Sequence, residues 1–273
     1  MIVVAVAAVQ VVAGSVVVVG KGRACATDHD GTTVTIAEAI DGATIGLADG
    51  GLVRLAGIEA PERPLGMPES RSWPLALVAR QGLERLAVGK DAVVDQIGSG
   101  PDRHGRMHAN VYLGETRQWL QSTLVVAGLA RVHWLPGDPP CIAALLDAEE
   151  AARARGLGIW SSPDYAVRQA NDPSLLARKG LYELVEGRVT SIGHGTSMIF
   201  VDFGREYRSD FTIMVSLRVA GRLSEGGISI DGLKGRRVRV RGVIEESGGP
   251  AIRLNDPVEI EVLADGDEAG GRG

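Results

Sequence analysis

The chain has 273 residues, enough for two domains of ordinary size. Its 29 Lys and Arg residues and 34 Asp and Glu residues give a formal net charge of −5. That balance excludes a protein that coats nucleic acid by its overall charge, although it allows a small basic cleft on an acidic body. Hydrophobic residues make up 45% of the chain, so most of it is expected to fold. With only two cysteines, a disulfide-dense scaffold and a four-cysteine zinc site are also excluded.

The first twenty residues are uncharged and almost wholly apolar, and the first cations, Lys21 and Arg23, follow them. We favour an export signal within residues 1–26, although the basic leader that normally precedes such a segment is missing. An uncleaved membrane anchor is the alternative, since about 20 apolar residues can span a bilayer, and a misassigned start codon would explain the missing leader. We therefore expect an exported protein, periplasmic or secreted, with membrane contact only through residues 1–20 if they are not cleaved.

The segment 30–162 alternates between strand and helix patterns. The β-branched alternation of residues 32–39 opens a β-meander with turns at Asp41-Gly42 and at residues 49–51. Apolar residues at helical spacing, with Gly128 and Gly156 as stops, indicate helices. The expected strands are 32–39, 44–47, 52–58, 92–97 and 107–113, and the expected helices are 73–88, 119–127 and 141–155. This order fits a small closed five-stranded barrel with three packed helices, as in an OB-fold.

The remainder of the chain returns to strand patterns after a polar, proline-containing segment, 163–180, which we predict to be a linker. Residues 181–264 are expected to form a second, smaller β domain, and the charged, Gly-rich residues 265–273 a frayed tail. The expected strands are 184–192, 198–203, 211–215, 236–245 and 258–262, with a short helix near 215–224. The predicted fold class is therefore mainly β (α+β), with an OB-fold barrel followed by an OB-like unit.

Most of the candidate catalytic residues lie in one short segment, Arg54 to Glu62. Arg54 is a cation in an otherwise apolar strand, and Glu59 and Glu62 follow where that strand ends. A turn at residues 102–106 presents a second arginine, Arg106, at the mouth of a hairpin. Two guanidinium groups suit the oxygens of a phosphate. A carboxylate beside them can act as general base on a water molecule, and another can bind a divalent cation. The combination points to phosphodiester hydrolysis.

Five separated motifs, in the same order and spacing, resemble those of the thermonuclease, or micrococcal-nuclease-like, family. They are AIDGAT at 39–44, VRLAGIEAPE at 53–62, DRHGR at 102–106, GLARV at 128–132 and GLGIW at 156–160. The resemblance covers residues 32–162 and implies an OB-fold nuclease that cuts DNA and RNA with Ca2+ and needs no small-molecule cofactor. It implies that Arg54 and Arg106 grip the phosphate and that Glu62 activates the attacking water. Glu59 and the Ala60 carbonyl would be calcium ligands.

The family motif is usually Asp-Gly-Asp-Thr, and its second Asp is the main calcium ligand. This chain has Asp41-Gly42-Ala43-Thr44, and the methyl group of Ala43 cannot bind a metal. Glu59 is then the one inherited ligand carboxylate, and Asp41 would have to support the ion indirectly. Since calcium prefers six to eight oxygen ligands, its binding should be weakened or lost. The alternative function is therefore a catalytically inactive homologue that binds nucleic acid or a protein.

The C-terminal half resembles the OB-like extension of some bacterial thermonuclease-family proteins, at residues 187–193, 200–212 and 235–263. Arg237, Arg239 and Arg241 share one face of an expected strand. With Tyr207 and Phe211 they would track a nucleic-acid strand by charge and stacking. The alternative is a solvated face balanced by Glu245 and Glu246.

We expect several other titratable residues to have structural roles, and the sequence leaves the pairing of the two cysteines undecided. His104 and His108 have no evident carboxylate partner, so we expect them at the surface or the barrel mouth. Asp147, Glu149 and Glu150 are expected on the solvated face of a helix. Cys25 and Cys141 would pair in an exported protein or remain separate thiols.

Overall fold

A computed structural model of the chain describes residues 31–62, 74–134, 142–206 and 209–264. The chain divides between Ala166 and Val167 into two compact units, which we describe separately. The expected export segment, the tail and both cysteines lie outside the described residues, so those predictions stay predictions. None of the helices among the described residues combines the length and apolar character needed to cross a membrane.

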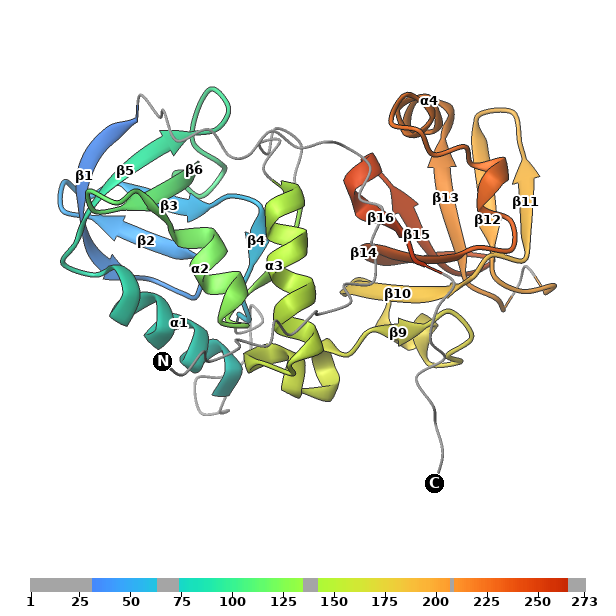
Figure 1. The fold of residues 1–273 in the computed structure, drawn as a ribbon, viewed down its shortest axis with the longest axis horizontal. Coiled ribbons are helices and arrows are strands. Elements are labelled where there is room, and N and C mark those ends of the chain that lie inside the picture. Colours follow the sequence, from blue (N-terminus) through green and yellow to red (C-terminus); the bar gives the residue numbers. More distant parts are fainter. Residues whose placement is uncertain (1–30, 63–73, 135–141, 207–208, 265–273) are drawn as a thin grey trace, which may run out of the picture. The chain divides into compact units, whose positions relative to one another are not determined.

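The first unit is a closed, mixed five-stranded barrel (Figure 1). Antiparallel pairing gives the order β3-β2-β1-β5-β6, and parallel pairing of β3 with β6 closes the ring. Alternating side chains such as Val53 and Leu55, which are 0% and 1% exposed, fill the interior. The strands are β1 (Thr32–Ala39), β2 (Thr44–Leu47), β3 (Leu52–Leu55), β5 (Asp91–Gln96) and β6 (Arg106–Leu113).

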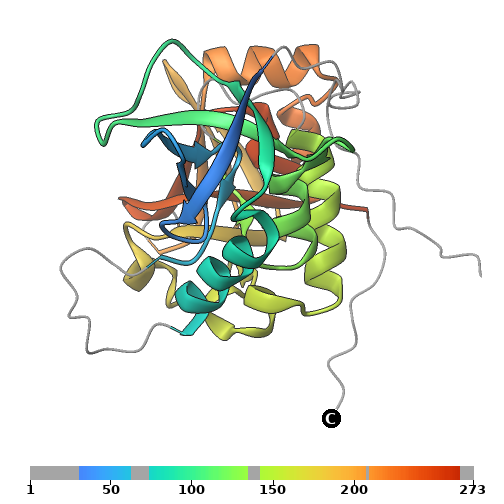
Figure 2. The same ribbon diagram turned by 90° about the vertical axis from the view of Figure 1, so that its left-hand side faces the viewer.

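Three helices accompany this barrel, as the sequence predicts. They are α1 (Pro74–Ala87), α2 (Leu120–Val126) and α3 (Ile142–Ala154). In Figure 2, the helix α1 lies below the blue strand β1, and the two elements are in contact. The helix α2 packs against β6 and α3. The fold-class prediction is confirmed for this unit.

The strand predicted over 52–58 is interrupted. Gly57 adopts a φ of +73°, a conformation that turns the chain after β3. The next two residues form β4 (Ile58–Glu59), which leaves the barrel and pairs with β8 (Arg131–Val132). A further short strand, β7 (Gln118–Trp119), extends the sheet beyond β6.

The second unit is a strongly curled sheet with the order β11-β12-β13-β15-β14-β10-β9. Only Val189 and Thr190 separate β10 from β11, so the sheet curls back on itself to form a half-barrel (Figure 1). The core contains the fully buried Phe211 and Leu223. The elements are β9 (Arg168–Gln169), β10 (Tyr182–Arg188), β11 (Ser191–His194), β12 (Met198–Asp202), β13 (Thr212–Ser216), α4 (Leu217–Glu225), β14 (Arg237–Ser247), β15 (Gly249–Leu254) and β16 (Ile260–Val262).

Two parts of this unit differ from the sequence-based expectation. The strand β15 was not predicted, because Gly248, Gly249 and Pro250 are typical of a turn, yet it pairs with both β13 and β14. Within the segment 163–180, β9 pairs in parallel with β10, and the side chain of Leu175 is fully buried. That segment therefore contributes to the second unit.

The sequence suggested that the arginine face of β14 either tracks a nucleic-acid strand or is a solvated face balanced by Glu245 and Glu246. Both interpretations are wrong. Arg239 and Arg241 are only 8% and 1% exposed, because the face carries a buried ladder of ion pairs. Glu186 of β10 binds both Arg237 and Arg239. Glu261 of β16 binds Arg239 and, at 2.7 Å, Arg241. The cross-strand register places Arg239 between the two glutamates. These arginines thus neutralise buried carboxylates within the sheet.

The other residues in those expectations have different partners. Glu246 binds Lys179 at 2.8 Å, and Glu245 binds Arg253 at 3.3 Å. The Phe211 ring is 0% exposed and packs beside Phe203, so it cannot stack on a base. Tyr207 lies outside the described residues.

Candidate active site

The guanidinium group of Arg54 is the centre of the first cluster. Its Nη1 atom lies 2.6 Å from Glu62 Oε1 and 3.5 Å from Asp41 Oδ1, and it also approaches the Thr44 hydroxyl at 3.4 Å. The Arg54 side chain is 13% exposed, whereas that of Glu62 is 47% exposed. The site therefore holds a largely buried cation with a carboxylate that is open to water.

The second cluster surrounds Arg106, the first residue of β6. Asp102 Oδ2 accepts hydrogen bonds from Arg106 Nε at 3.0 Å and from Nη2 at 2.8 Å. Asp102 Oδ1 accepts from the backbone N–H groups of His104 and Arg106, which fixes the turn. Burial alone would raise the pKa of Asp102. The hydrogen bonds from Arg106 and His104 and the charge of Arg106 outweigh it and hold that pKa well below its usual range.

The two clusters lie on one face of the barrel. In the parallel β3–β6 pair, Leu52 is opposite Arg106 and Arg54 is opposite His108. Since alternate residues of a strand share a face, Arg54, Arg106 and His108 all project from the outer face, away from the interior that Val53 fills. Paired strands are about 5 Å apart, so the two arginines lie on adjacent strands of one face.

Glu59 is bound to a different arginine. On the short β4–β8 ribbon, its Oε2 atom lies 2.6 Å from Arg131 Nη2 and 2.7 Å from Arg131 Nε. The Arg131 guanidinium also lies 5.2 Å from the centre of the Tyr165 ring. The structure therefore brings together Arg54, Glu62 and Asp41, places Arg106 on the adjacent strand, and engages Glu59 with a different arginine.

The residues present do not fit a calcium ion well. Ala43 is fully buried and offers only a methyl side chain. Asp41 Oδ1 already accepts the Ala43 N–H at 2.7 Å, and Glu59 is bound to Arg131. Ala60 does lie beside this turn, since a Cβ atom on Gly42 would fall 2.6 Å from the Ala60 Cβ. Across the described residues, no group of three or more acidic, His or Cys side chains is arranged to hold a metal.

Two residues of this unit have partners that the sequence did not reveal. Glu149 is 1% exposed and accepts the backbone N–H of Val132 at 2.7 Å, so its expected position on a solvated face is wrong. His108 Nε2 lies 3.7 Å from Asp102 Oδ2, so this histidine does have a neighbouring carboxylate. Both pairs depend on strands and turns meeting in space, which residue spacing alone does not show.

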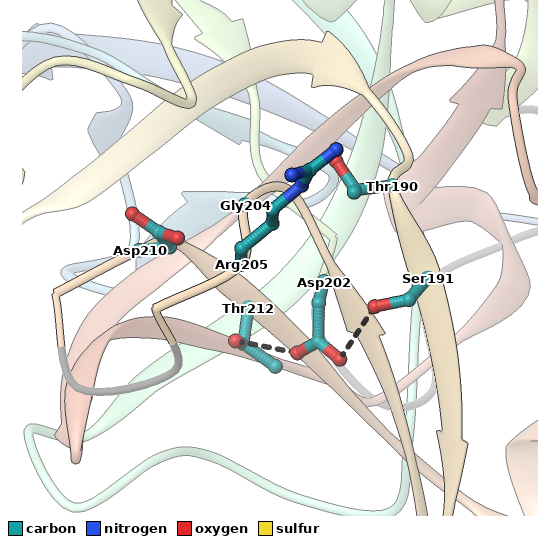
Figure 3. A pocket seen from close by; sticks show the side chains of 7 residues that line it. All are labelled: Thr190, Ser191, Asp202, Gly204, Arg205, Asp210 and Thr212. Carbon is teal, nitrogen blue, oxygen red and sulfur yellow. Dashed lines mark hydrogen bonds between the residues drawn. The ribbon is translucent and has the colours of Figure 1, made fainter.

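A separate polar pocket of about 280 Å³ lies in the second unit (Figure 3). Asp202 accepts hydrogen bonds from the hydroxyl groups of Thr212 at 2.9 Å and Ser191 at 3.4 Å. Asp210 accepts the backbone N–H of Glu206, and Arg205 extends past Thr190 in the figure. The carboxylates of this pocket are thus engaged by residues of its own lining and of the adjoining turn.

The first unit is thus a closed OB-like barrel with Arg54 and Arg106 on one outer face. Comparison with known families agrees, since residues 52–162 match the family model described as staphylococcal nuclease homologue. The chain therefore contains a staphylococcal-nuclease-like domain, followed by a second curled β half-barrel. A comparison with curated proteins finds no match.

Proposed function

We propose that the first unit hydrolyses phosphodiester bonds of DNA or RNA. The observation that carries this proposal is the placement of Arg54 and Arg106 on one outer face of the paired strands β3 and β6. The open carboxylate of Glu62 lies beside Arg54. The match to the nuclease family supports a nucleic acid as the substrate.

In this proposal the arginines bind the non-bridging oxygens of the phosphate. Their hydrogen bonds shorten and strengthen as negative charge develops in the transition state. Glu62 uses one oxygen to hold Arg54, and the other is available to accept a proton from the attacking water. Asp102 keeps the Arg106 guanidinium in a fixed orientation through two hydrogen bonds.

The first experiment is cleavage of single-stranded DNA by the purified protein, followed on a gel. We expect Arg106→Ala to reduce turnover by about 10²- to 10³-fold, which is the usual cost of losing one transition-state donor. Arg155→Ala, which removes an exposed arginine outside the site, is the matched control and should cleave normally. An unchanged rate in Arg106→Ala would contradict the proposed role.

Calcium dependence is tested separately, because the side chains at the expected ligand positions fit the ion poorly. We expect the melting temperature of the wild-type protein to respond little to calcium. Ala43→Asp should lower that temperature in chelator, because it buries a carboxylate at a fully enclosed position. Added calcium should then raise it through binding to the folded state. A strong calcium response in the wild-type protein would mean that the ion is held by other groups.

The second candidate function is nucleic-acid or protein binding without cleavage. The engagement of Glu59 by Arg131 and the methyl group of Ala43 favour it. It predicts that DNA is retarded on the gel but is not cut with or without calcium. Cleavage that disappears in Arg106→Ala would exclude this alternative.

A further inference from the structure

His108 is a titratable side chain on the candidate catalytic face that the nuclease motifs do not include. It lies on β6, two residues after Arg106, and its partner in the parallel register is Arg54. Its Nε2 atom is 3.7 Å from Asp102 Oδ2, the same oxygen that holds Arg106. The imidazole is 26% exposed, so it can contact a bound substrate.

Phosphodiester hydrolysis needs a proton donor as well as a base, because the departing alkoxide is a strong base. The arginines cannot give up a proton in a protein at ordinary pH. Glu62 is assigned to the attacking water, and Asp102 is ionised because hydrogen bonds hold its pKa well below the usual range. An imidazole can carry a proton near neutral pH, and a neighbouring carboxylate orients it and stabilises its charged form.

We propose that His108 is the general acid that protonates the leaving oxygen, an inference that rests on the phosphodiesterase function proposed above. As the water oxygen bonds to phosphorus, its proton passes to Glu62. The bond from phosphorus to the leaving oxygen breaks, its electron pair stays on that oxygen, and the oxygen takes the proton of the His108 imidazolium. Neutral His108 and protonated Glu62 then exchange with solvent, so atoms and charge balance over the cycle.

Charged groups face His108 from its own strand, from the preceding turn and from β3. Asp102 faces Nε2, so in the charged ring the proton on Nδ1 is the one directed away from the carboxylate. Arg106 shares Asp102 with the imidazole, and Arg54 lies opposite on β3. On the β5 side, the backbone N–H of the apolar Ile97 donates to the His108 carbonyl. Asp102 is thus the acidic partner of His108 on this face.

The test compares two substrates that differ in their need for a proton on the leaving group. DNA has an alkoxide leaving group, whereas bis(p-nitrophenyl) phosphate releases nitrophenolate, which is stable without a proton. We expect His108→Gln to slow DNA cleavage by about 10²-fold or more and to change nitrophenyl ester cleavage little. His194→Gln, at an exposed histidine of the second unit, is the control and should behave as wild type on both substrates.

The outcomes separate this inference from the proposed function. If the wild-type protein cleaves both substrates and His108→Gln loses the two activities equally, the residue acts in binding or folding, and the inference is overturned. Undiminished DNA cleavage in His108→Gln overturns it as well. If the wild-type protein cleaves neither substrate, the phosphodiesterase proposal fails and this inference fails with it. Should His108→Gln not fold, His108→Ala with added imidazole replaces it, and selective rescue of DNA cleavage is the supporting result.

Discussion

At the scale of single residues, Asp102 of the DRHGR motif connects several parts of the candidate site. One carboxylate fixes the turn through two backbone N–H groups, orients Arg106, and faces His108. It does not need to touch the substrate. Its effect on catalysis would come from holding a catalytic cation in one orientation.

We predict that Asp102→Asn lowers both cleavage and stability. The folded-state pKa of Asp102 lies below its ordinary value of 3.8, so its stabilising effect is fully present above that pH and is lost as the pH falls toward the folded-state pKa. The difference in unfolding free energy between wild type and Asp102→Asn should therefore be larger at pH 7 than at pH 3. Urea unfolding at the two pH values measures it. A difference that does not change with pH would mean that the carboxylate charge is unimportant.

The sequence predicted part of this site and missed part of it. Arg54 and Glu62 belong to one short motif, and the motif already implies that they act together. The approach of Asp102 to His108 depends on the turn at 102–106 folding back over β6, which spacing in the chain does not reveal. A local signal did exist, because an aspartate that begins a glycine-containing turn commonly accepts the N–H two residues later.

At the scale of elements, two glycine motifs far apart in the sequence meet in space. Gly128 follows α2, Gly158 follows α3, and the Gly128 carbonyl accepts the Ile159 N–H at 2.9 Å. Both glycines have a positive φ. A Cβ atom on Gly128 would lie 2.2 Å from the Leu157 carbonyl oxygen, and one on Gly158 would lie 2.1 Å from that of Gly128. The sequence predicted helix ends at Gly128 and Gly156 but not this contact.

We predict that Gly158→Ala destabilises the protein far more than Gly156→Ala. Both positions have a positive φ, but a Cβ atom on Gly156 would meet no other atom within 4 Å. The cost at Gly156 should therefore be the backbone strain alone, about 1 kcal/mol, whereas Gly158 adds a backbone clash. Thermal unfolding of the two variants tests this comparison. Equal losses would mean that the close approach of the two turns contributes nothing.

At the scale of the whole molecule, the two units repeat one strand order without a recognisable repeat in sequence. In the first unit β3 pairs in parallel with β6, and in the second β13 pairs in parallel with β15. A helix follows the first strand of each parallel pair, α1 in one unit and α4 in the other. Only the first unit places an arginine at the start of the second strand of that pair. The fold class was predictable from the alternation of apolar residues and from the turn residues. The sequence did not show that the arginines lie on an outer barrel face in the first unit and in buried ion pairs in the second.

The buried ladder of the second unit gives a prediction about both stability and binding. Arg239→Met removes the arginine that Glu186 and Glu261 share, although each glutamate keeps one other arginine, so we expect a loss of about 1–3 kcal/mol of unfolding free energy in urea. The DNA affinity of the folded variant and its salt dependence should match those of wild type. A weaker affinity with a shallower salt slope would show that Arg239 contacts phosphate.

The pairing of the strands in both units has a consequence for the behaviour of the protein at high concentration. Among the described strands, those with a partner on one side only are β4, β7, β8, β9, β11 and β16, and each has two to four residues. The long apolar strands have neighbours on both sides. Short unpaired edges give another chain little backbone on which to add a strand. Within the part of the chain that the structure describes, intermolecular sheet growth therefore has few places to start.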